Sequence, residues 1–552
     1  MKFLIVLTLI LCSSTTYAAI LIESPNGTLQ NSSAITTMAQ ACSQTNPIHV
    51  TSALSASFSN ISSVTIHSCS APIHVHPGGS LGNTTTFRLS GPLTTDGDYQ
   101  IFNGTGAIVL PGTYPVKPVW FGNCLTDLGI PLNKAISSII NVGGEIVLPS
   151  GSLTQLTAIN LTAAALTGTF INSIKILGVP RNTNINAQLT GPAFDCTGAQ
   201  FLEFRDFTVT GNASTRPTTA FLFARNNYSP GANNANSAGN NHMYNVTTSG
   251  YFSQAALYNY ASEDFRAYDC TFGQYTLGKP AVVVTRTNIL GLSSPYTTIA
   301  SGSQSTTEIR FNGCSINNFA VSSTADSLYL EGVLGFGFEN GFMVNLGRAY
   351  VYIDASVSSS TNLSFKNLMF DGSPSAALFG FYIHGVNGVA YMTVDNILDY
   401  GVKTFANGGL TLSTDSVTGD SLSSLVWKNY YATQAGATLV VENLDVSDIT
   451  LQPGDSFIGN YGITRSKFSL ASTKLTLTRT DLSNNNSFYF YDIPATGNGL
   501  NTTRNGATMP TTGSWVTGDR ELYTGSSTTP ANGWRRITTG SGNVLNTDWI
   551  AF

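Results

Sequence analysis

Carboxylate, guanidinium, imidazole and phenol side chains recur at two positions of a repeated segment, and these residues are the best candidates for chemistry. Hydrolysis of a glycosidic bond needs two carboxylates about 5 to 9.5 Å apart, one of which donates a proton. Glu203 and Asp264 are the candidates for this catalytic pair. Sugars are held by aromatic rings and by charged hydrogen-bonding groups. The candidate substrate-binding residues of the segment are Arg205, His242, Tyr244, Arg266, Tyr268 and Arg310.

The same residues fit two other interpretations. A polysaccharide lyase would need a base together with a cation that steadies a uronate. Alternatively, the charges form a solvated outer face with local ion pairs, for example between Glu203 and a neighbouring arginine. An enzyme should hold two carboxylates in a groove, one with a raised pKa, whereas a structural rod should show scattered charges and no cleft.

A repeated segment positions these residues. It reads apolar, exposed, Asn/Asp/Gly, apolar, exposed and usually apolar, at irregular intervals of one or two coils. Short strands that recur in coils of about 20 to 25 residues indicate a solenoid. Asn, Asp and Gly tolerate left-handed backbone angles, so we expect the middle residue to be a bend, and stacked asparagines to share amide hydrogen bonds. The aligned segments begin at Phe204, Met243, Ala267, Phe311, Phe365, Val394 and Val441.

Alternation along each strand determines which side chains face outward, because side chains in a strand have a period of two. The first residue of each segment is expected to point into the core. The residues immediately before and after it are expected to point outward. In a stack of parallel strands these two columns form one continuous surface, here called the outer stripe, and its first half contains the candidate site residues.

A helix is expected just before the main run of repeats. Residues 131–140 carry apolar side chains at helical spacing, with Pro131 suited to the first turn and a glycine pair after the end. A helix that is apolar on one side would cover the open end of a stack of strands, whose backbone groups otherwise invite aggregation.

This entry region resembles that of a known superfamily. Trp120-Phe-Gly122, Asp127, the expected helix and Gly143-Gly-Glu-Ile-Val-Leu-Pro-Ser-Gly151 resemble the pectate-lyase-like superfamily, in its phage-tailspike and bacterial surface-protein branch. The resemblance implies an all-β fold, a right-handed single-stranded parallel β-helix, and it makes a homotrimer one expected assembly. The family's acidic loop is reduced to Asp127 here. The polygalacturonase acidic segments and the calcium-binding aspartates of pectate lyases are absent, so no catalytic residue is carried over.

The C-terminal segment also carries a resemblance. Residues 510–519 and 533–540 resemble a small β module that often ends tailspike-like proteins. Trp515 and Trp534 are candidate substrate-binding residues of this module. Alternatively, tryptophans in so small a module build its core.

The N-terminus has the pattern of a signal peptide. Lys2 precedes an apolar run at 3–11, and cleavage is expected after Ala18. That run is too short to span a bilayer, and no later segment is apolar enough to cross one. We therefore expect a secreted or cell-surface protein without a transmembrane segment. Export permits disulfides, and Cys42 and Cys69 are the candidate pair.

Composition limits the class of partner. Only 10% of the residues are charged, the net charge is -5, and no run of Lys or Arg occurs. Because nucleic acid needs a basic face, we expect no nucleic-acid partner. A polar but weakly charged surface suits a hydroxyl-rich partner such as a polysaccharide or surface glycan. Alternatively, the many Asn, Ser and Thr residues only form turns.

His74-x-His76 is the one pattern that suggests a metal. No Cys or carboxylate at ligand spacing accompanies it in the sequence. We therefore expect two outward side chains on one face of a strand, and neither a metal nor another cofactor.

The sequence predicts four parts and two alternative functions. The parts are a signal peptide (1–18), an N-terminal β region (19–122), a parallel β-helix (123–480) and a small C-terminal β module (481–552). The first function is an exported polysaccharide-recognising protein, which as an enzyme would be a glycan depolymerase of the hydrolase or lyase class. The alternative is a non-catalytic surface adhesin or structural fibre protein.

Overall fold

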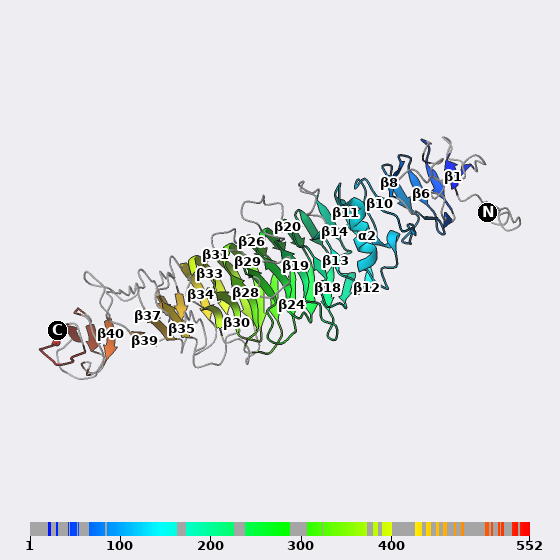
Figure 1. Cartoon of the computed structure of the whole chain (residues 1–552). Helices are drawn as coiled ribbons and strands as arrows, with labels where there is room; N and C mark the ends of the chain where they lie inside the picture. The colour runs from blue at the N-terminus through cyan, green and yellow to red at the C-terminus, as the bar shows by residue number, and fades with distance from the viewer. Residues whose placement is uncertain are drawn as a thin grey trace, which may run out of the picture. The chain divides into compact units, whose positions relative to one another are not determined.

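The structure is a computed structural model, in which short strands predominate (Figure 1). The chain divides into two compact units. The first unit comprises Met1–Asn186 with Phe201–Phe207, and the second comprises Ala187–Gln200 with Thr208–Phe552. The predicted signal peptide lies outside the described residues, and the predicted domain boundaries remain predictions. The described residues are 20–23, 29–30, 42, 45–51, 53–54, 66–82, 86–162, 173–225, 238–287, 306–322, 324–371, 379–384, 389–399, 426–432, 438–442, 449–451, 456–460, 468–470, 476–479, 503–506, 509, 511, 517–518, 520–523, 533–538 and 541–552.

Short stacked strands form the N-terminal part of the first unit. Neighbouring strands pair in parallel and lie about one coil apart in the sequence, except that β1 pairs antiparallel with both β2 and β3. One sheet contains, in spatial order, β2 (Leu29–Gln30), β1 (Ile20–Glu23), β3 (Ile48–Val50), β6 (Ile73–Val75) and β9 (Leu93–Thr95). The others contain β10 (Ile108–Val109), β8 (Thr86–Leu89) and β5 (Ile66–Cys69), and the pair β4 (Ala53–Leu54) and β7 (Ser80–Leu81).

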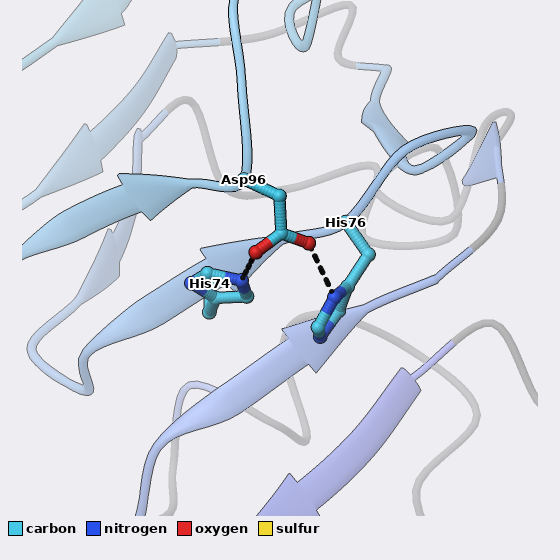
Figure 2. A group of neighbouring side chains, drawn as sticks. All are labelled: His74, His76 and Asp96. Atoms are coloured by element: carbon cyan, nitrogen blue, oxygen red, sulfur yellow. Dashed lines mark hydrogen bonds and ion pairs between the residues drawn. The ribbon is translucent and has the colours of Figure 1, made fainter.

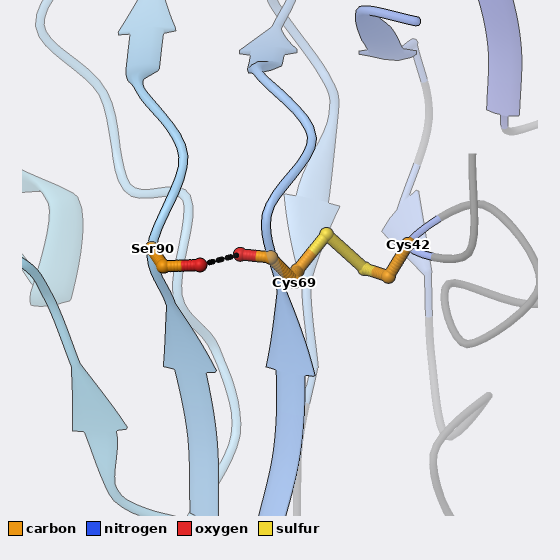
Figure 3. The surroundings of a disulfide bond; sticks show 3 residues. All are labelled: Cys42, Cys69 and Ser90. Atoms are coloured by element: carbon orange, nitrogen blue, oxygen red, sulfur yellow. Dashed lines mark hydrogen bonds between the residues drawn. A yellow bond between two sulfur atoms is a disulfide. The ribbon is translucent and has the colours of Figure 1, made fainter. Parts of the chain in front are cut away.

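A disulfide joins Cys42 to Cys69, at the end of β5 (Figure 3). The carbonyl oxygen of Cys69 accepts hydrogen bonds from the backbone N–H and the hydroxyl group of Ser90, which follows β8. The bond therefore ties the segment around Cys42 to a coil that is itself held by the next one.

The rest of the first unit begins with two helices. The 3₁₀ helix η1 (Pro118–Phe121) and the α-helix α2 (Gly129–Ile139) precede further parallel strands. α2 contacts β10 as well as β11 and β13, and the backbone of Val116 pairs with that of Ile146 in β11. The helix thus contacts strands that precede it and strands that follow it in the chain, and the expectation that it covers an open end of the stack stays a prediction. The later strands are β11 (Gly144–Val147), β12 (Gly151–Gln155), β13 (Ile159–Asn160), β14 (Ile174–Leu177), β15 (Thr183–Ala187) and β17 (Leu202–Arg205).

Asp127 connects the start of α2 to the strand turn that follows β12. One carboxylate oxygen accepts hydrogen bonds from the backbone N–H groups of Gly129, Leu156 and Thr157, and the other accepts one from the Thr157 hydroxyl at 2.7 Å. Burial opposes ionisation, but the hydrogen bonds from Thr157, Leu156 and Gly129 outweigh it and lower the pKa of Asp127. Asp127 therefore acts as a structural clamp between the start of α2 and the turn at Leu156 and Thr157.

Replacing Asp127 by alanine should lower the free energy of unfolding of the first unit by about 2–3 kcal/mol, because it leaves backbone donors without an acceptor. The lowered pKa means that this stabilisation is complete above the ordinary carboxyl value of 3.8 and is lost as the pH falls through the folded-state value. Urea unfolding at several pH values should therefore show a smaller acid-induced loss for the variant than for the wild type. Asp98→Ala, which removes an exposed carboxylate paired with Lys117, is the control. Equal acid sensitivity in wild type and Asp127→Ala would contradict the clamp.

Parallel strands also build the second unit, and the predicted parallel β-helix is confirmed by their registers. The strands β19 (Thr219–Ala224), β22 (Ala255–Tyr260) and β25 (Val282–Thr285) belong to one sheet, here called the inner sheet. They are buried along their whole length, which is typical of parallel strands covered on both faces. One sheet contains β18 (Thr208–Gly211), β20 (Gly239–Tyr244), β21 (Thr247–Gly250), β23 (Glu263–Tyr268), β24 (Thr271–Gln274), β26 (Thr306–Asn312), β27 (Ser315–Asn318), β29 (Val333–Asn345), β31 (Ser360–Asp371), β33 (Val389–Asp399), β34 (Val426–Ala432), β36 (Ile449–Leu451) and β38 (Phe468–Leu470).

The remaining strands of this unit form three more sheets. The inner sheet contains β16 (Phe194–Asp195), β19 (Thr219–Ala224), β22 (Ala255–Tyr260), β25 (Val282–Thr285), β28 (Asp326–Glu331), β30 (Ala349–Asp354) and β32 (Phe379–His384). The C-terminal sheets contain β35 (Thr438–Glu442), β37 (Ser456–Asn460) and β39 (Thr476–Arg479), and then β40 (Thr503–Gly506), β41 (Arg520–Tyr523), β42 (Gly533–Arg536) and β43 (Trp549–Ala551). Among the residues listed above, no helix has the length and apolarity needed to span a lipid bilayer.

The predicted bend at Asn443 lies outside the described residues, and the other predicted bends are left-handed. Asparagine side chains at or next to the bends form hydrogen bonds between coils. The side-chain amide of Asn340 donates to the amide oxygen of Asn312 at 3.2 Å, Asn367 donates to Asn340 at 2.9 Å, and Asn396 donates to Asn367 at 2.9 Å. Each bond joins neighbouring coils, so the ladder helps to fix their register. The predicted bends that have positive φ are Asp206, Asn245, Asp269, Gly313, Asn367 and Asn396.

Candidate functional site

The outer stripe of the second unit is aligned across neighbouring strands. The registers of β20, β23 and β26 place His242 beside Arg266 and Arg310 in one column, and Tyr244 beside Tyr268 in the other. These side chains are half-buried or exposed. The residues that alternate with them, Met243, Ala267 and Phe311, are buried, so the predicted facing of the strands is confirmed.

Aromatic rings form the centre of this surface. The rings of Tyr244 and Tyr268 stack with centroids 5.1 Å apart and planes inclined by 8°. The ring of His242 meets that of Tyr244 edge-on, at 6.2 Å and 87°. One face of each tyrosine ring is covered by the other, and the Tyr268 side chain also forms a hydrogen bond with Arg266.

Asp264 and Arg266 form an ion pair at the edge of the rings. The guanidinium Nε donates to the Asp264 carboxylate at 2.8 Å, and the pair is partly exposed. The hydrogen bond that Arg266 donates to the Asp264 carboxylate raises the pKa of Arg266. Asp264 has a left-handed backbone with φ of 46°, two residues before Arg266 in the same strand. The carboxylate is therefore oriented by an arginine of its own strand, at a partly exposed position.

The second carboxylate candidate belongs to the first unit. Glu203 in β17 accepts a hydrogen bond from the Arg205 guanidinium at 2.7 Å, as in the predicted local ion pair. Lys175 and Leu177 of β14 lie beside these two residues in the parallel register. Because Glu203 and Asp264 lie in different units, a catalytic pair made of the two stays a prediction.

The described carboxylate with a raised pKa lies away from the outer stripe. Burial raises the pKa of Asp326 to about 6, even though Arg348 pairs with both of its oxygens. Its side chain is almost fully buried, so it serves the interior of the fold.

The C-terminal module uses tryptophan in its core. Trp549 is fully buried, and the buried guanidinium of Arg536 lies 5.5 Å from the centre of its ring. Trp534 is half-buried in β42, where it pairs with Glu521 and Ala551 of the neighbouring strands. Trp515 lies outside the described residues. The sugar-binding role of Trp515 and Trp534 stays a prediction.

A cluster of imidazoles and one carboxylate lies in the first unit (Figure 2). His74 of β6 and His76, which directly follows β6, both contact Asp96, with nitrogen-to-oxygen distances of 2.8 Å. Asp96 follows the neighbouring strand β9. His49 of β3 contacts His76 on the other side at 2.9 Å and Glu23 of β1 at 3.1 Å. The ligand atoms of His74, His76 and Asp96 lie within 4.8 Å of one another.

Sequence reasoning missed this cluster because Asp96 is distant in the chain. The parallel registers put His49 beside His74 and His74 beside Thr94, so the next outward positions bring His76 and Asp96 together. One signal could have found it. Pro-Ile-His-Val occurs at 47–50 and again at 72–75, and Pro92 starts a third related segment that ends at Asp96.

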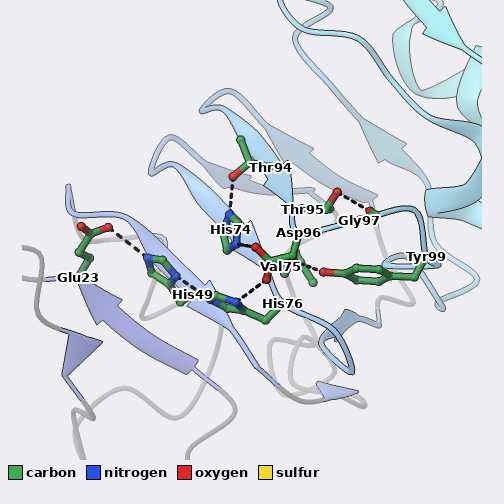
Figure 4. Close-up of polar contacts among 10 residues, drawn as sticks. All are labelled: Glu23, His49, His74, Val75, His76, Thr94, Thr95, Asp96, Gly97 and Tyr99. Atoms are coloured by element: carbon green, nitrogen blue, oxygen red, sulfur yellow. Dashed lines mark hydrogen bonds and ion pairs between the residues drawn. The ribbon is translucent and has the colours of Figure 1, made fainter. Parts of the chain in front are cut away.

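A surface cavity adjoins the ends of the same strands. Its volume is about 420 Å³. The hydroxyl group of Tyr99, a lining residue, donates to the carbonyl oxygen of Val75, which lies between His74 and His76 in the chain (Figure 4). The lining residues are Pro77, Gly78, Gly79, Ser80, Tyr99, Gln100 and Asn103.

Comparisons with known proteins give structural likenesses only. No protein-family model matches the sequence, and no curated protein matches it. ORF18 of Geobacillus virus E2 aligns with a TM-score of 0.36 and 12% identity over 66% of this chain and 60% of that one. The Agl-KA catalytic domain aligns with a TM-score of 0.35 and 11% identity, over 78% of this chain and 64% of that one. PfbA, a surface adhesin of Streptococcus pneumoniae, aligns with a TM-score of 0.36 and 13% identity, over 70% of this chain and 97% of that one.

This chain spans less than two thirds of the length of the first two of these proteins. The description of the fold as a parallel β-helix rests on the strand registers of the chain itself.

Proposed function

We propose that this protein is an exported polysaccharide-binding protein, and that the outer stripe of β20, β23 and β26 is its binding surface. The observation that carries the proposal is the stacked pair of Tyr244 and Tyr268, with His242 and Arg266 beside it on the same two strands. Aromatic rings next to charged hydrogen-bond donors form the surface that sugars need. Export is proposed from the signal-peptide pattern of residues 1–18.

The repeated geometry favours a polymer as the ligand. Neighbouring strands lie about 4.8 Å apart, so each column presents a side chain at regular steps along the stack. The imidazole and guanidinium column of His242, Arg266 and Arg310 runs beside the tyrosine column in this way. A chain of sugar units can contact several steps at once, which adds binding energy without a deep pocket.

Binding without cleavage fits the carboxylates best. Glu203 and Asp264 each accept a charge-assisted hydrogen bond from an arginine two residues further along the strand. Each carboxylate is thus already engaged by a guanidinium of its own strand, as expected for a solvated surface with local ion pairs. We therefore propose the adhesin-like alternative rather than the depolymerase.

Replacing Tyr268 by alanine should weaken polysaccharide binding about tenfold, because an aromatic contact contributes about 1 to 1.5 kcal/mol. The measurement is a glycan array followed by calorimetry with the polysaccharide that binds. Tyr275→Ala is the matched control, since Tyr275 is 40% exposed and also stacks on a ring, that of Phe319. An equal loss of affinity in Tyr275→Ala, or no binding to any polysaccharide, would exclude the outer stripe as the site. New reducing ends that disappear in Glu203→Gln would instead support a depolymerase.

A further inference from the structure

We propose that His74, His76 and Asp96 bind a divalent transition-metal ion such as Zn²⁺, and that Thr94, His49 and Glu23 orient the two imidazole ligands. This site lies in the first unit and is independent of the proposed polysaccharide-binding surface.

The backbone brings the three ligands to one point. His74 and His76 are two residues apart in or next to β6, so both side chains leave the same face of the strand. Asp96 leaves the end of β9, which pairs in parallel with β6. The imidazole centroids are 4.4 Å apart, and each ring directs one nitrogen at a different oxygen of the same carboxylate (Figure 2).

With neutral imidazole rings, the contacts among Glu23, His49, His76 and Asp96 have one hydrogen-bond donor too few. A neutral imidazole has one N–H group and one lone pair. Glu23 only accepts, so His49 donates to it through Nε2 and accepts through Nδ1 (Figure 4). His76 therefore donates through Nε2 to His49, and its Nδ1 lone pair lies 2.8 Å from Asp96, which is also an acceptor. Two lone pairs face each other across that short contact.

A metal cation at this position resolves the conflict. His76 would bind it through Nδ1 while Nε2–H donates to His49. His74 would bind it through Nε2 while Nδ1–H donates to the Thr94 hydroxyl, now at 2.8 Å. Every ring then carries one N–H, every N–H has an acceptor, and both oxygens of Asp96 face positive charge. Metal-binding histidines typically donate their other N–H to such outer partners. A second proton on the imidazoles would also supply a donor, and the experiment below distinguishes the two.

The ligand set and its exposure indicate the class of metal. Imidazole with carboxylate suits Zn²⁺ and neighbouring transition metals more than Ca²⁺ or Mg²⁺, which prefer oxygen ligands. Zn²⁺ binds these atoms at about 2.0–2.2 Å, so tetrahedral ligands lie about 3.4 Å apart, within reach of small side-chain rotations from the present separations. His74 and His76 are only 25% and 28% exposed, whereas Asp96 is 42% exposed, so an ion can enter from solvent. Three protein ligands leave a fourth position for water or another ligand.

The test is Zn²⁺ titration of the full chain, without a polyhistidine tag, by calorimetry, with Co²⁺ absorption as a direct reading of ligand geometry. We expect one ion per chain at this site, and affinity at least 100-fold lower in His76→Ala and Asp96→Asn. Asp98→Asn is the matched control, because Asp98 is an exposed carboxylate two residues away that pairs with Lys117. Its affinity should equal that of the wild type.

A milder variant covers the case in which ligand removal unfolds the coil. Glu23→Gln keeps the shape of the side chain, and it should weaken Zn²⁺ binding about 10- to 100-fold, as other changes in outer partners do. No Zn²⁺ or Co²⁺ binding by the wild type would overturn the proposal and favour an additional proton in the cluster. Wild-type affinity in folded His76→Ala, Asp96→Asn or Glu23→Gln would also overturn it, as would a loss in Asp98→Asn as large as that in Asp96→Asn.

Discussion

Replacing Arg348 by alanine is expected to lower the free energy of unfolding of the second unit by about 3–5 kcal/mol, because the change leaves a buried carboxylate without its partner. Arg348 donates through Nε and Nη2 to the two oxygens of Asp326, at 3.0 and 2.7 Å. Asp326 is 2% exposed. The guanidinium also lies 3.7 Å from the centre of the Tyr352 ring, so alanine removes packing as well as charge.

The effect of Arg348→Ala should depend on pH. Burial raises the pKa of Asp326 to about 6, above its ordinary value of 3.8. The raised pKa means that the neutral carboxyl group of Asp326 stabilises the folded state. This stabilisation is greatest below pH 3.8 and is lost as the pH rises through about 6. At pH 4 the carboxyl group is largely neutral in the folded protein, and the variant loses mainly the packing of Arg348. At pH 7 it also loses the partner of a buried anion, so the destabilisation should be larger.

Urea unfolding at pH 4 and pH 7 measures this difference. Arg266→Ala is the matched control, since its guanidinium pairs with a carboxylate that is partly exposed, and such pairs contribute about 0–1 kcal/mol. The double variant Asp326→Leu/Arg348→Met should be more stable than Arg348→Ala at pH 7, because no charge is then left buried. A loss in Arg348→Ala that is the same at both pH values would mean that Asp326 does not need its partner.

The bends of the repeat could be predicted because they depend on local chemistry. Asn, Asp and Gly accept a left-handed backbone, and apolar residues on either side determine which face is buried. Asn340 was missed because Gly341 follows it, at the position where the other segments carry an apolar residue. The same local pattern predicted the facing of Tyr244 and Tyr268 in the outer stripe.

Two residues in a second column of left-handed residues could not be predicted from residue type. Glu308 and Tyr391 have φ values of 56° and 55°, although neither residue type favours this conformation. Pairing with neighbouring coils imposes the conformation, and such long-range effects are absent from a local pattern. The histidine cluster was missed for a related reason, since the distance between His76 and Asp96 depends on the length of one coil.

Replacing both Cys42 and Cys69 by serine should lower the free energy of unfolding of the first unit by about 3.5 kcal/mol, the value that the chain-entropy model gives for a loop of this length. The two cysteines are 27 residues apart, and β3 lies between them. Without the bond, the unfolded segment gains freedom that folding has to remove. The loss should be local, because Cys69 stays attached through its carbonyl oxygen to Ser90 of the next coil (Figure 3).

Hydrogen exchange of the amides in β3 and β6 measures this local stability better than a single melting temperature, since a chain of two units need not unfold in one step. Exchange in these strands should speed up by about 300- to 400-fold, which corresponds to the expected loss. Reductant should bring the wild type to the rate of the Cys42→Ser/Cys69→Ser variant and leave the variant unchanged. Exchange that is equally fast in the oxidised wild type and the variant would mean that packing of β3 against β6, rather than the covalent bond, holds the N-terminal coils together.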